Sequence, residues 1–296
     1  MSSEKFKGTG VAIITPFLKN NKIDFDSLGK IMQHLKNGKV EYLVLMGTTG
    51  ESVTLNKDER TELKEFVIKR NAGRLPLVLG LGGNNTSEII YSLKNENLNG
   101  FDAILSVSPY YNKPSQEGIY QHYKAIAKAS PLPIILYNVP GRTSSNILPK
   151  TTLKLATEFK NIIGIKEASG NMEQCMEIIK NKPSDFLVIS GDDNLTFPLL
   201  ASGADGVISV AAHLFPKDFS DMVRFTAKGK IAEGRKLHYK QFEITQQLFA
   251  DGNPGGVKYA LSCIGLCQPY LRLPLVEPNT DVKKRIKSLM ASYNNR

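Results

Sequence analysis

The sequence predicts an α/β fold: a (β/α)8 TIM barrel followed by a C-terminal appendage of three helices. Three observations predict it. Eight short apolar runs recur along the 296 residues, helical patterns fill the gaps between them, and the alternation stops beyond Ala232. Eight βα units without an interposed linker favour a closed barrel over an open, doubly wound sheet.

The eight apolar runs are the predicted strands, and they start 20 to 34 residues apart. Most of them are continuously apolar rather than alternating, which is typical of parallel strands covered on both faces. In chain order they are Val11–Phe17, Tyr42–Gly47, Pro76–Gly82, Ala103–Pro109, Pro133–Pro140, Ile162–Ser169, Phe186–Asp193 and Gly206–His213.

The gaps between these strands carry helical periodicity. Apolar residues recur at i, i+3, i+4 and i+7 within Leu28–Leu35, and shorter versions of the pattern lie within Leu63–Val67 and Ile119–Ile126. Asn56, with Glu59 three residues later, predicts a capping box at the start of the second helix.

Beyond the eighth unit, helical patterns near Ile231–Ala250, Gly256–Ile264 and Val282–Tyr293 predict the appendage. No stretch rich in Pro, Gly or Ser marks a linker before them. We therefore expect a catalytic barrel over residues 1–231 and a helical appendage over residues 232–296.

Composition limits the possible classes of function. The 38 Lys+Arg against 28 Asp+Glu give a formal charge of +10, which would suit a nucleic-acid or membrane surface. The cations are dispersed, however, and the densest cluster, Lys283–Lys287, is small. Since no aromatic-basic motif accompanies them, we expect a solvated basic face and no nucleic-acid partner. No run is long enough to span a bilayer and the N-terminus lacks an apolar signal core, so we expect no membrane association.

The three cysteines give an odd count and no disulfide framework, and the four histidines are scattered without ligand spacing. We therefore expect free thiols, a cytoplasmic location and no metal site.

Lys166 is the strongest candidate for chemistry. It lies within the apolar, strand-like run Ile162–Ser169, and water-poor surroundings penalise the charged form of an amine. A neutral lysine amine is the nucleophile that Schiff-base formation on a carbonyl substrate requires. The alternative is a strand-end lysine that reaches solvent or pairs with a carboxylate.

The carboxyl ends of the other predicted strands add polar groups where barrel active sites lie. Each group also has a structural explanation: Gly47–Glu51 as a capped turn rather than a carboxylate site, Tyr110 and Tyr111 as packing, Arg142 as a surface charge. The segments at these ends are Gly47–Glu51, Ser108–Asn112, Tyr137–Arg142, Gly191–Asp193 and Ile208–Ser209.

Five motifs in this order resemble the 4-hydroxy-tetrahydrodipicolinate (dihydrodipicolinate) synthase family of pyruvate-dependent class I aldolases. The resemblance covers essentially the whole chain, and the motifs are Gly47–Ser52, Pro109–Gly118, Leu136–Thr143, Ile162–Ala168 and Ser190–Asp193. One departure is Gly255-Gly256 after Asn253-Pro254, where many members carry Ile-Pro. It lies outside the five motifs, so we expect it to affect the local backbone rather than the chemistry.

The resemblance implies a reaction without a cofactor. Lys166 would attack the ketone carbon of pyruvate to form an imine and then an enamine. Tyr137 would be the general acid/base, with Thr48 and Tyr111 as a hydroxyl relay. Tyr111 would reach the site of a neighbouring subunit in a homotetramer built as a dimer of dimers.

The resemblance also implies the binding groups. Thr49 would hold the pyruvate carboxylate in a pocket lined by Ile208. Arg142, with main chain at Gly191, would hold the carboxylate of the second substrate, L-aspartate 4-semialdehyde.

A site for feedback inhibition by lysine is implied less completely. The matching positions are Ser52, Lys57, Asn84, Glu88 and Tyr110. Lys57 stands where sensitive members usually carry histidine, and its charge would repel a ligand with two ammonium groups. We expect weak inhibition.

Two alternatives remain open. A sister aldolase such as N-acetylneuraminate lyase would share the lysine and the tyrosine but take another aldehyde, and Arg142 with Tyr110 and Tyr111 favours the synthase. A catalytically silent barrel with a binding role is disfavoured because every expected catalytic position is filled.

Overall fold

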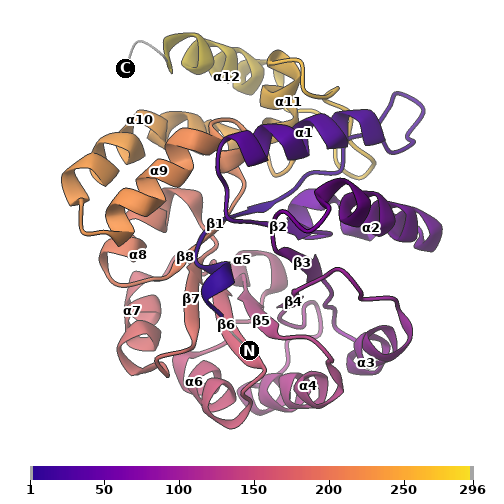
Figure 1. The fold of residues 1–296 in the computed structure, drawn as a ribbon, viewed down its shortest axis with the longest axis vertical. Helices are drawn as coiled ribbons and strands as arrows, with labels where there is room; N and C mark the ends of the chain where they lie inside the picture. Colours follow the sequence, from indigo (N-terminus) through magenta and orange to yellow (C-terminus); the bar gives the residue numbers. More distant parts are fainter. Residues whose placement is uncertain (1–2, 294–296) are drawn as a thin grey trace.

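The computed structural model describes residues 3–293 as a closed barrel of eight parallel strands ringed by helices (Figure 1). Neighbouring strands pair in sequence order, and the first strand pairs with the eighth to close the barrel. The predicted (β/α)8 fold is confirmed. The strands are β1 Gly8–Ala12, β2 Tyr42–Leu45, β3 Leu77–Gly80, β4 Ala103–Val107, β5 Ile134–Asn138, β6 Ile162–Glu167, β7 Leu187–Ser190 and β8 Gly206–Ser209.

The bounds predicted for the first strand were wrong. The predicted run was Val11–Phe17, whereas β1 starts at Gly8 and ends at Ala12. The reason is that apolarity reports burial and not strand pairing: Ile13 and Phe17 are 1% and 0% exposed in the connection that follows the strand.

Helices cover the outside of the barrel, and short 3-10 turns join several of them to strands. The barrel helices are α1 Phe25–Asn37, α2 Lys57–Asn71, α3 Thr86–Asn95, α4 Gln116–Ala129, α5 Pro140–Thr143, α6 Pro149–Glu158, α7 Met172–Asn181, α8 Thr196–Ala201 and α9 Pro216–Ala227. The 3-10 turns are η1 Glu4–Phe6, η2 Thr48–Gly50, η3 Ser52–Thr54, η4 Asp193–Leu195 and η5 Ala211–His213.

The capping box predicted for the second helix is confirmed at α2. The Asn56 side chain accepts a hydrogen bond from the Glu59 backbone N–H at 2.9 Å, and the Glu59 carboxylate accepts one from the Asn56 N–H at 3.0 Å.

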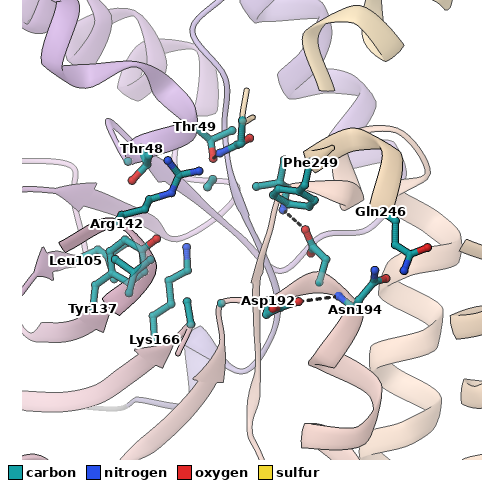
Figure 2. A pocket seen from close by; sticks show the side chains of 18 of the residues that line it. Thr48, Thr49, Leu105, Tyr137, Arg142, Lys166, Asp192, Asn194, Gln246 and Phe249 are labelled. Atoms are coloured by element: carbon teal, nitrogen blue, oxygen red, sulfur yellow. Dashed lines mark hydrogen bonds between the residues drawn. The ribbon is translucent and has the colours of Figure 1, made fainter. Parts of the chain in front are cut away.

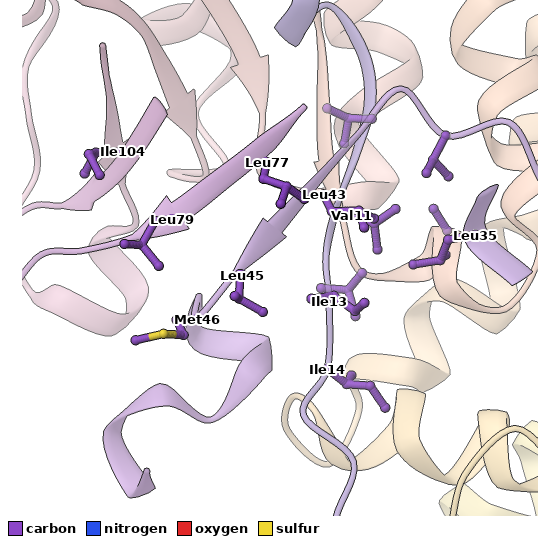
Figure 3. Packing of buried hydrophobic residues seen from close by; sticks show 14 of the residues in the cluster. Val11, Ile13, Ile14, Leu35, Leu43, Leu45, Met46, Leu77, Leu79 and Ile104 are labelled. Atoms are coloured by element: carbon purple, nitrogen blue, oxygen red, sulfur yellow. The ribbon is translucent and has the colours of Figure 1, made fainter. Parts of the chain in front are cut away.

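Two apolar layers hold the barrel together. Leu43 and Leu45 of β2 pack outward in the layer between strands and helices (Figure 3). Tyr42 and Val44 of the same strand pack inward in the barrel interior. Both faces of the strand are therefore buried, as expected for parallel strands.

A β-bulge in β6 sets the direction of its last residues. Ile134 of β5 pairs with Ile162, whereas Ile135 pairs with Gly164, so β6 carries one extra residue. A one-residue shift in a strand moves every later side chain to the opposite face. Lys166 consequently pairs with the inward-facing Tyr137 rather than with an outward-facing neighbour.

The appendage has the three helices predicted, α10 Ile231–Phe249, α11 Gly255–Cys263 and α12 Thr280–Ser292. It packs closely on the barrel: the ring of Tyr293 stacks on that of Phe215 at 3.5 Å between centroids. The division into residues 1–231 and 232–296 stays a prediction. Within residues 3–293, no helix combines the length and apolarity needed to cross a membrane.

Candidate active site

A cavity of about 470 Å³ opens at the carboxyl end of the barrel, a volume suited to a small molecule (Figure 2). Lys166 points into it toward Arg142 and the threonines that follow β2. Gln246 and Phe249 of α10 line the opposite side. The predicted groups that share this lining are Thr48, Thr49, Tyr137, Arg142, Lys166 and Gly191.

Lys166 and Tyr137 lie side by side on the adjacent strands β6 and β5. The lysine is 6% exposed and the tyrosine 8%, and the lysine Nζ lies 4.4 Å from the centroid of the tyrosine ring. Among residues 3–293 no carboxylate forms an ion pair with Lys166. Neither alternative from the sequence, a solvent-reaching lysine or a paired one, describes this side chain.

Gly191 gives Lys166 the room to extend. A Cβ at position 191 would lie 2.9 Å from the Lys166 Cε and 2.7 Å from the Ala168 Cβ, closer than carbon atoms approach without displacement. The absence of a side chain at this position therefore keeps the path of the lysine open.

The threonines belong to a tight turn after β2. Its 3-10 geometry closes with hydrogen bonds from Gly50 N–H to Gly47 O and from Glu51 N–H to Thr48 O, both 3.1 Å. Thr48 is exposed at the cavity, whereas Thr49 is 3% exposed and its hydroxyl accepts a hydrogen bond from Asn253 Nδ2 at 2.9 Å.

Arg142 lies on α5, directly after β5, and is exposed. It lines the main cavity and also an adjoining one of about 300 Å³ that contains Tyr110 and Val53. Its guanidinium therefore stands where the two cavities meet, free to receive a carboxylate with two parallel hydrogen bonds.

Two predicted residues are not part of this cavity. Tyr111 is 88% exposed and has a positive φ of 72°. Ile208 is 1% exposed and packs in the barrel interior with Tyr137, and Val210, two residues later, lines the cavity instead.

The residues predicted for an effector are mostly together. Ser52, Asn84, Glu88 and Tyr110 line a separate cavity of about 310 Å³, in which Asn84 Nδ2 donates to the Tyr110 carbonyl at 3.1 Å. Lys57 does not line it. It borders the neighbouring cavity between α2 and α3.

The sequence reasoning missed the contribution of the C-terminal appendage to the site. Asn253, which precedes α11, lines the cavity and donates to Thr49. The expectation that the Gly255-Gly256 departure affects the local backbone rather than the chemistry stays a prediction. The signal was present in the Asn253–Lys258 motif, but nothing in the sequence indicated which turn it contacts.

Asp193 was given no role of its own in the sequence analysis, and it lines the same cavity. Its carboxylate accepts hydrogen bonds from the Val210 and Ala211 N–H groups, both at 3.0 Å, which fixes the end of β8. Burial raises the pKa of Asp193 above its ordinary value.

Fold and site together define a class: a (β/α)8 barrel with a buried lysine and a tyrosine side by side at its carboxyl end, as in Schiff-base class I aldolases. Within that class, the chain belongs to the dihydrodipicolinate synthetase family, which matches residues 5–292.

Relatives and solved structures agree over nearly the whole chain. A 4-hydroxy-tetrahydrodipicolinate synthase of Flavobacterium psychrophilum is 52% identical over 283 residues, 96% of this chain and 97% of the relative. The chloride-inhibited dihydrodipicolinate synthase of Acinetobacter baumannii, solved with pyruvate, matches with a TM-score of 0.94 at 38% identity and covers 97% of this chain and 99% of its own. A monomeric dihydrodipicolinate synthase variant matches with a TM-score of 0.95 at 38% identity and covers 98% of this chain and 97% of its own.

Proposed function

We propose that this protein condenses pyruvate with L-aspartate 4-semialdehyde to give 4-hydroxy-tetrahydrodipicolinate, a step of lysine and diaminopimelate biosynthesis. One observation carries the proposal: a buried lysine without a carboxylate partner projects into a small cavity beside a buried tyrosine. The name shared by the curated relatives supports the same reaction.

Lys166 is the nucleophile in this proposal. Its amine adds to the ketone carbon of pyruvate, and water leaves as the imine forms. The imine acidifies the neighbouring methyl group, and loss of a proton from that carbon gives the enamine that attacks the aldehyde. Tyr137, beside the lysine Nζ, is the general acid/base that moves these protons.

The two carboxylates of the substrates are assigned to two different groups in the lining of the cavity. The buried Thr49 hydroxyl and the turn around it receive the pyruvate carboxylate, and Ile208, which packs with Tyr137 in the barrel interior, is assigned to the support of that pocket. Arg142, where the two cavities meet, receives the carboxylate of the semialdehyde, assisted by main chain at Gly191.

Tyr111 is assigned to the site of a neighbouring subunit, in a relay with Thr48 and Tyr137. Its side chain is 88% exposed, which leaves it free to enter a partner. This assignment needs at least a dimer, and we propose a homotetramer of two such dimers. The three free cysteines suit a reducing compartment, so we assign the protein to the cytoplasm.

Trapping with borohydride tests the covalent step. Reduction in the presence of pyruvate should add one pyruvyl-derived mass per chain, on Lys166, and Lys166→Ala should abolish both the adduct and turnover in an assay coupled to the downstream reductase. Lys182→Met, a lysine at the other end of the barrel, is the control and should keep the adduct. An adduct on another lysine, or an enzyme that cleaves N-acetylneuraminate and ignores aspartate semialdehyde, would refute the proposal.

A further inference from the structure

Three side chains of the C-terminal segment hold the turn that carries Thr48 and Thr49. We call residues 47–51 the threonine turn. Asn253 donates to the Thr49 hydroxyl, Lys258 pairs with Glu51, and Arg272 donates to the Thr54 carbonyl at 2.8 Å just beyond the turn. Residues more than 200 positions apart in sequence thus meet at one end of the site.

The ion pair between Lys258 and Glu51 is completely enclosed, with both side chains at 0% exposure. The second carboxylate oxygen of Glu51 accepts the Arg272 N–H at 3.2 Å. The Lys258 Nζ also donates to the Tyr270 carbonyl at 2.9 Å and lies 4.2 Å from the centroid of the Phe17 ring. Because their hydrogen-bonding groups are satisfied within the protein, the two charges fix each other's position and take no part in binding a ligand.

The backbone at Glu51 explains why such a hold is needed. Its φ of 51° and ψ of 36° lie in the left-handed region. This conformation is unfavourable for a residue with a side chain, because the Cβ comes too close to the following carbonyl oxygen. This residue ends the threonine turn, and its carbonyl accepts the Thr54 N–H at 3.1 Å. A strained conformation persists only where its surroundings over-determine it, and here the surroundings are Lys258 and the chain near Arg272.

Asn253 acts on the middle of the same turn, at Thr49. A hydroxyl has a single proton and two acceptor positions. When Asn253 Nδ2 fills one acceptor position of Thr49, the hydroxyl proton stays available for donation into the cavity. A carboxylate in the cavity is the group that would accept it.

We propose that Lys258, acting through Glu51, is a positioning residue for the pyruvate carboxylate, and that Asn253 sets the direction of the Thr49 hydroxyl. This inference rests on the proposed function, since it concerns the same pocket. An apolar pair of similar volume could hold the segment in place as firmly as a buried ion pair does. What the charges and their hydrogen bonds add is one fixed geometry of the turn.

The test separates positioning from stability with two double variants. Glu51→Gln/Lys258→Met keeps the shape of the pair and removes both charges. The control is Lys182→Met/Asp205→Asn at the other end of the barrel. There, Lys182 likewise forms an ion pair with a carboxylate, at 3.2 Å, and donates to a carbonyl, and Asp205 accepts a backbone N–H at 3.0 Å.

The Glu51→Gln/Lys258→Met variant should raise the KM for pyruvate, and the pyruvate concentration for half-maximal borohydride trapping, about tenfold. That corresponds to about 1.4 kcal/mol. Its kcat at saturating pyruvate and its KM for the semialdehyde should change less than about twofold, because the variant leaves Lys166, Tyr137 and Arg142 unchanged. The control should leave both pyruvate values unchanged, whatever it does to the melting temperature.

The inference would be overturned if the KM for pyruvate and the concentration for half-maximal trapping were the same in wild type and in the Glu51→Gln/Lys258→Met variant. It would also be overturned if both quantities rose equally in the control. If this variant does not fold, Glu51→Gln/Lys258→Gln decides, since it removes both charges but keeps a pair that can hydrogen-bond, and it should still raise the pyruvate KM severalfold. A wild-type protein that traps no pyruvate would instead refute the proposed function itself.

Asn253 is tested by a cycle with Thr49. Asn253→Ala and Thr49→Val should each raise the pyruvate KM, and the double variant should be no worse than the poorer single one, because both remove the same hydrogen bond to the carboxylate. Additive effects would overturn the role given to Asn253.

Discussion

Protonation of His213 at acidic pH should lower the free energy of unfolding, because this residue joins the ends of the two strands that close the barrel. This residue is 0% exposed and lies in η5, just after β8. Its Nδ1 faces the Val210 carbonyl at 2.9 Å and must carry the proton, so Nε2 is the acceptor for the Ile14 N–H at 3.2 Å. Ile14 follows β1 and Val210 follows β8, the pair of strands that closes the barrel. A proton on Nε2 would replace this hydrogen bond by a repulsive contact between two buried N–H groups, one on Nε2 and one on the Ile14 backbone.

The size of the effect follows from the pKa. Burial lowers the pKa of His213 from 6.5 to about 4. The folded state therefore binds fewer protons than the unfolded state, and the stability that His213 contributes is complete above pH 6.5 and is lost as the pH falls toward 4. The full difference is about 3 kcal/mol, of which about 2 kcal/mol is lost at pH 5.

Urea unfolding of wild type and His213→Gln at pH 7.5, 6 and 5 measures this loss. Glutamine offers a donor and an acceptor but takes up no proton. The free energy of unfolding of wild type, relative to the variant, should fall by about 2 kcal/mol from pH 7.5 to pH 5. His122, whose pKa burial also lowers to about 4, is present in both proteins and cancels. A difference that stays constant with pH would refute the reasoning.

Three further predictions concern the site. Arg142→Ala should raise the KM for aspartate semialdehyde and lower kcat while borohydride trapping of pyruvate survives. Loss of trapping would contradict the assignment of Arg142 to the semialdehyde carboxylate. Lysine should inhibit only partially at millimolar concentration. The Lys57 charge, in the cavity next to that of the other effector residues, costs a ligand with two ammonium groups about 1 kcal/mol, or roughly fivefold in affinity. Lys57→His should tighten inhibition, and half-inhibition of wild type at low micromolar lysine would contradict this. Overnight chelation should leave activity unchanged, since residues 3–293 include no group of three or more metal-ligating side chains; activity lost to a chelator and restored by zinc or magnesium would contradict it.

The sequence by itself predicted the barrel and much of its site. Continuous apolar runs at regular spacing have few solutions other than parallel strands covered by helices. Because the carboxyl ends of such strands converge, Thr48, Tyr137, Arg142 and Lys166 could be expected at one place before any coordinates were known. The capping box of α2 was equally local and equally predictable.

Other features depended on the tertiary structure. The bulge between Ile162 and Gly164, which turns Lys166 inward, depends on the register between β5 and β6, and an apolar run looks the same in either register. The pairing of Glu51 with Lys258 joins residues 207 positions apart. A buried charge in a sequence does not name its partner, because only the packed chain decides which opposite charge it meets.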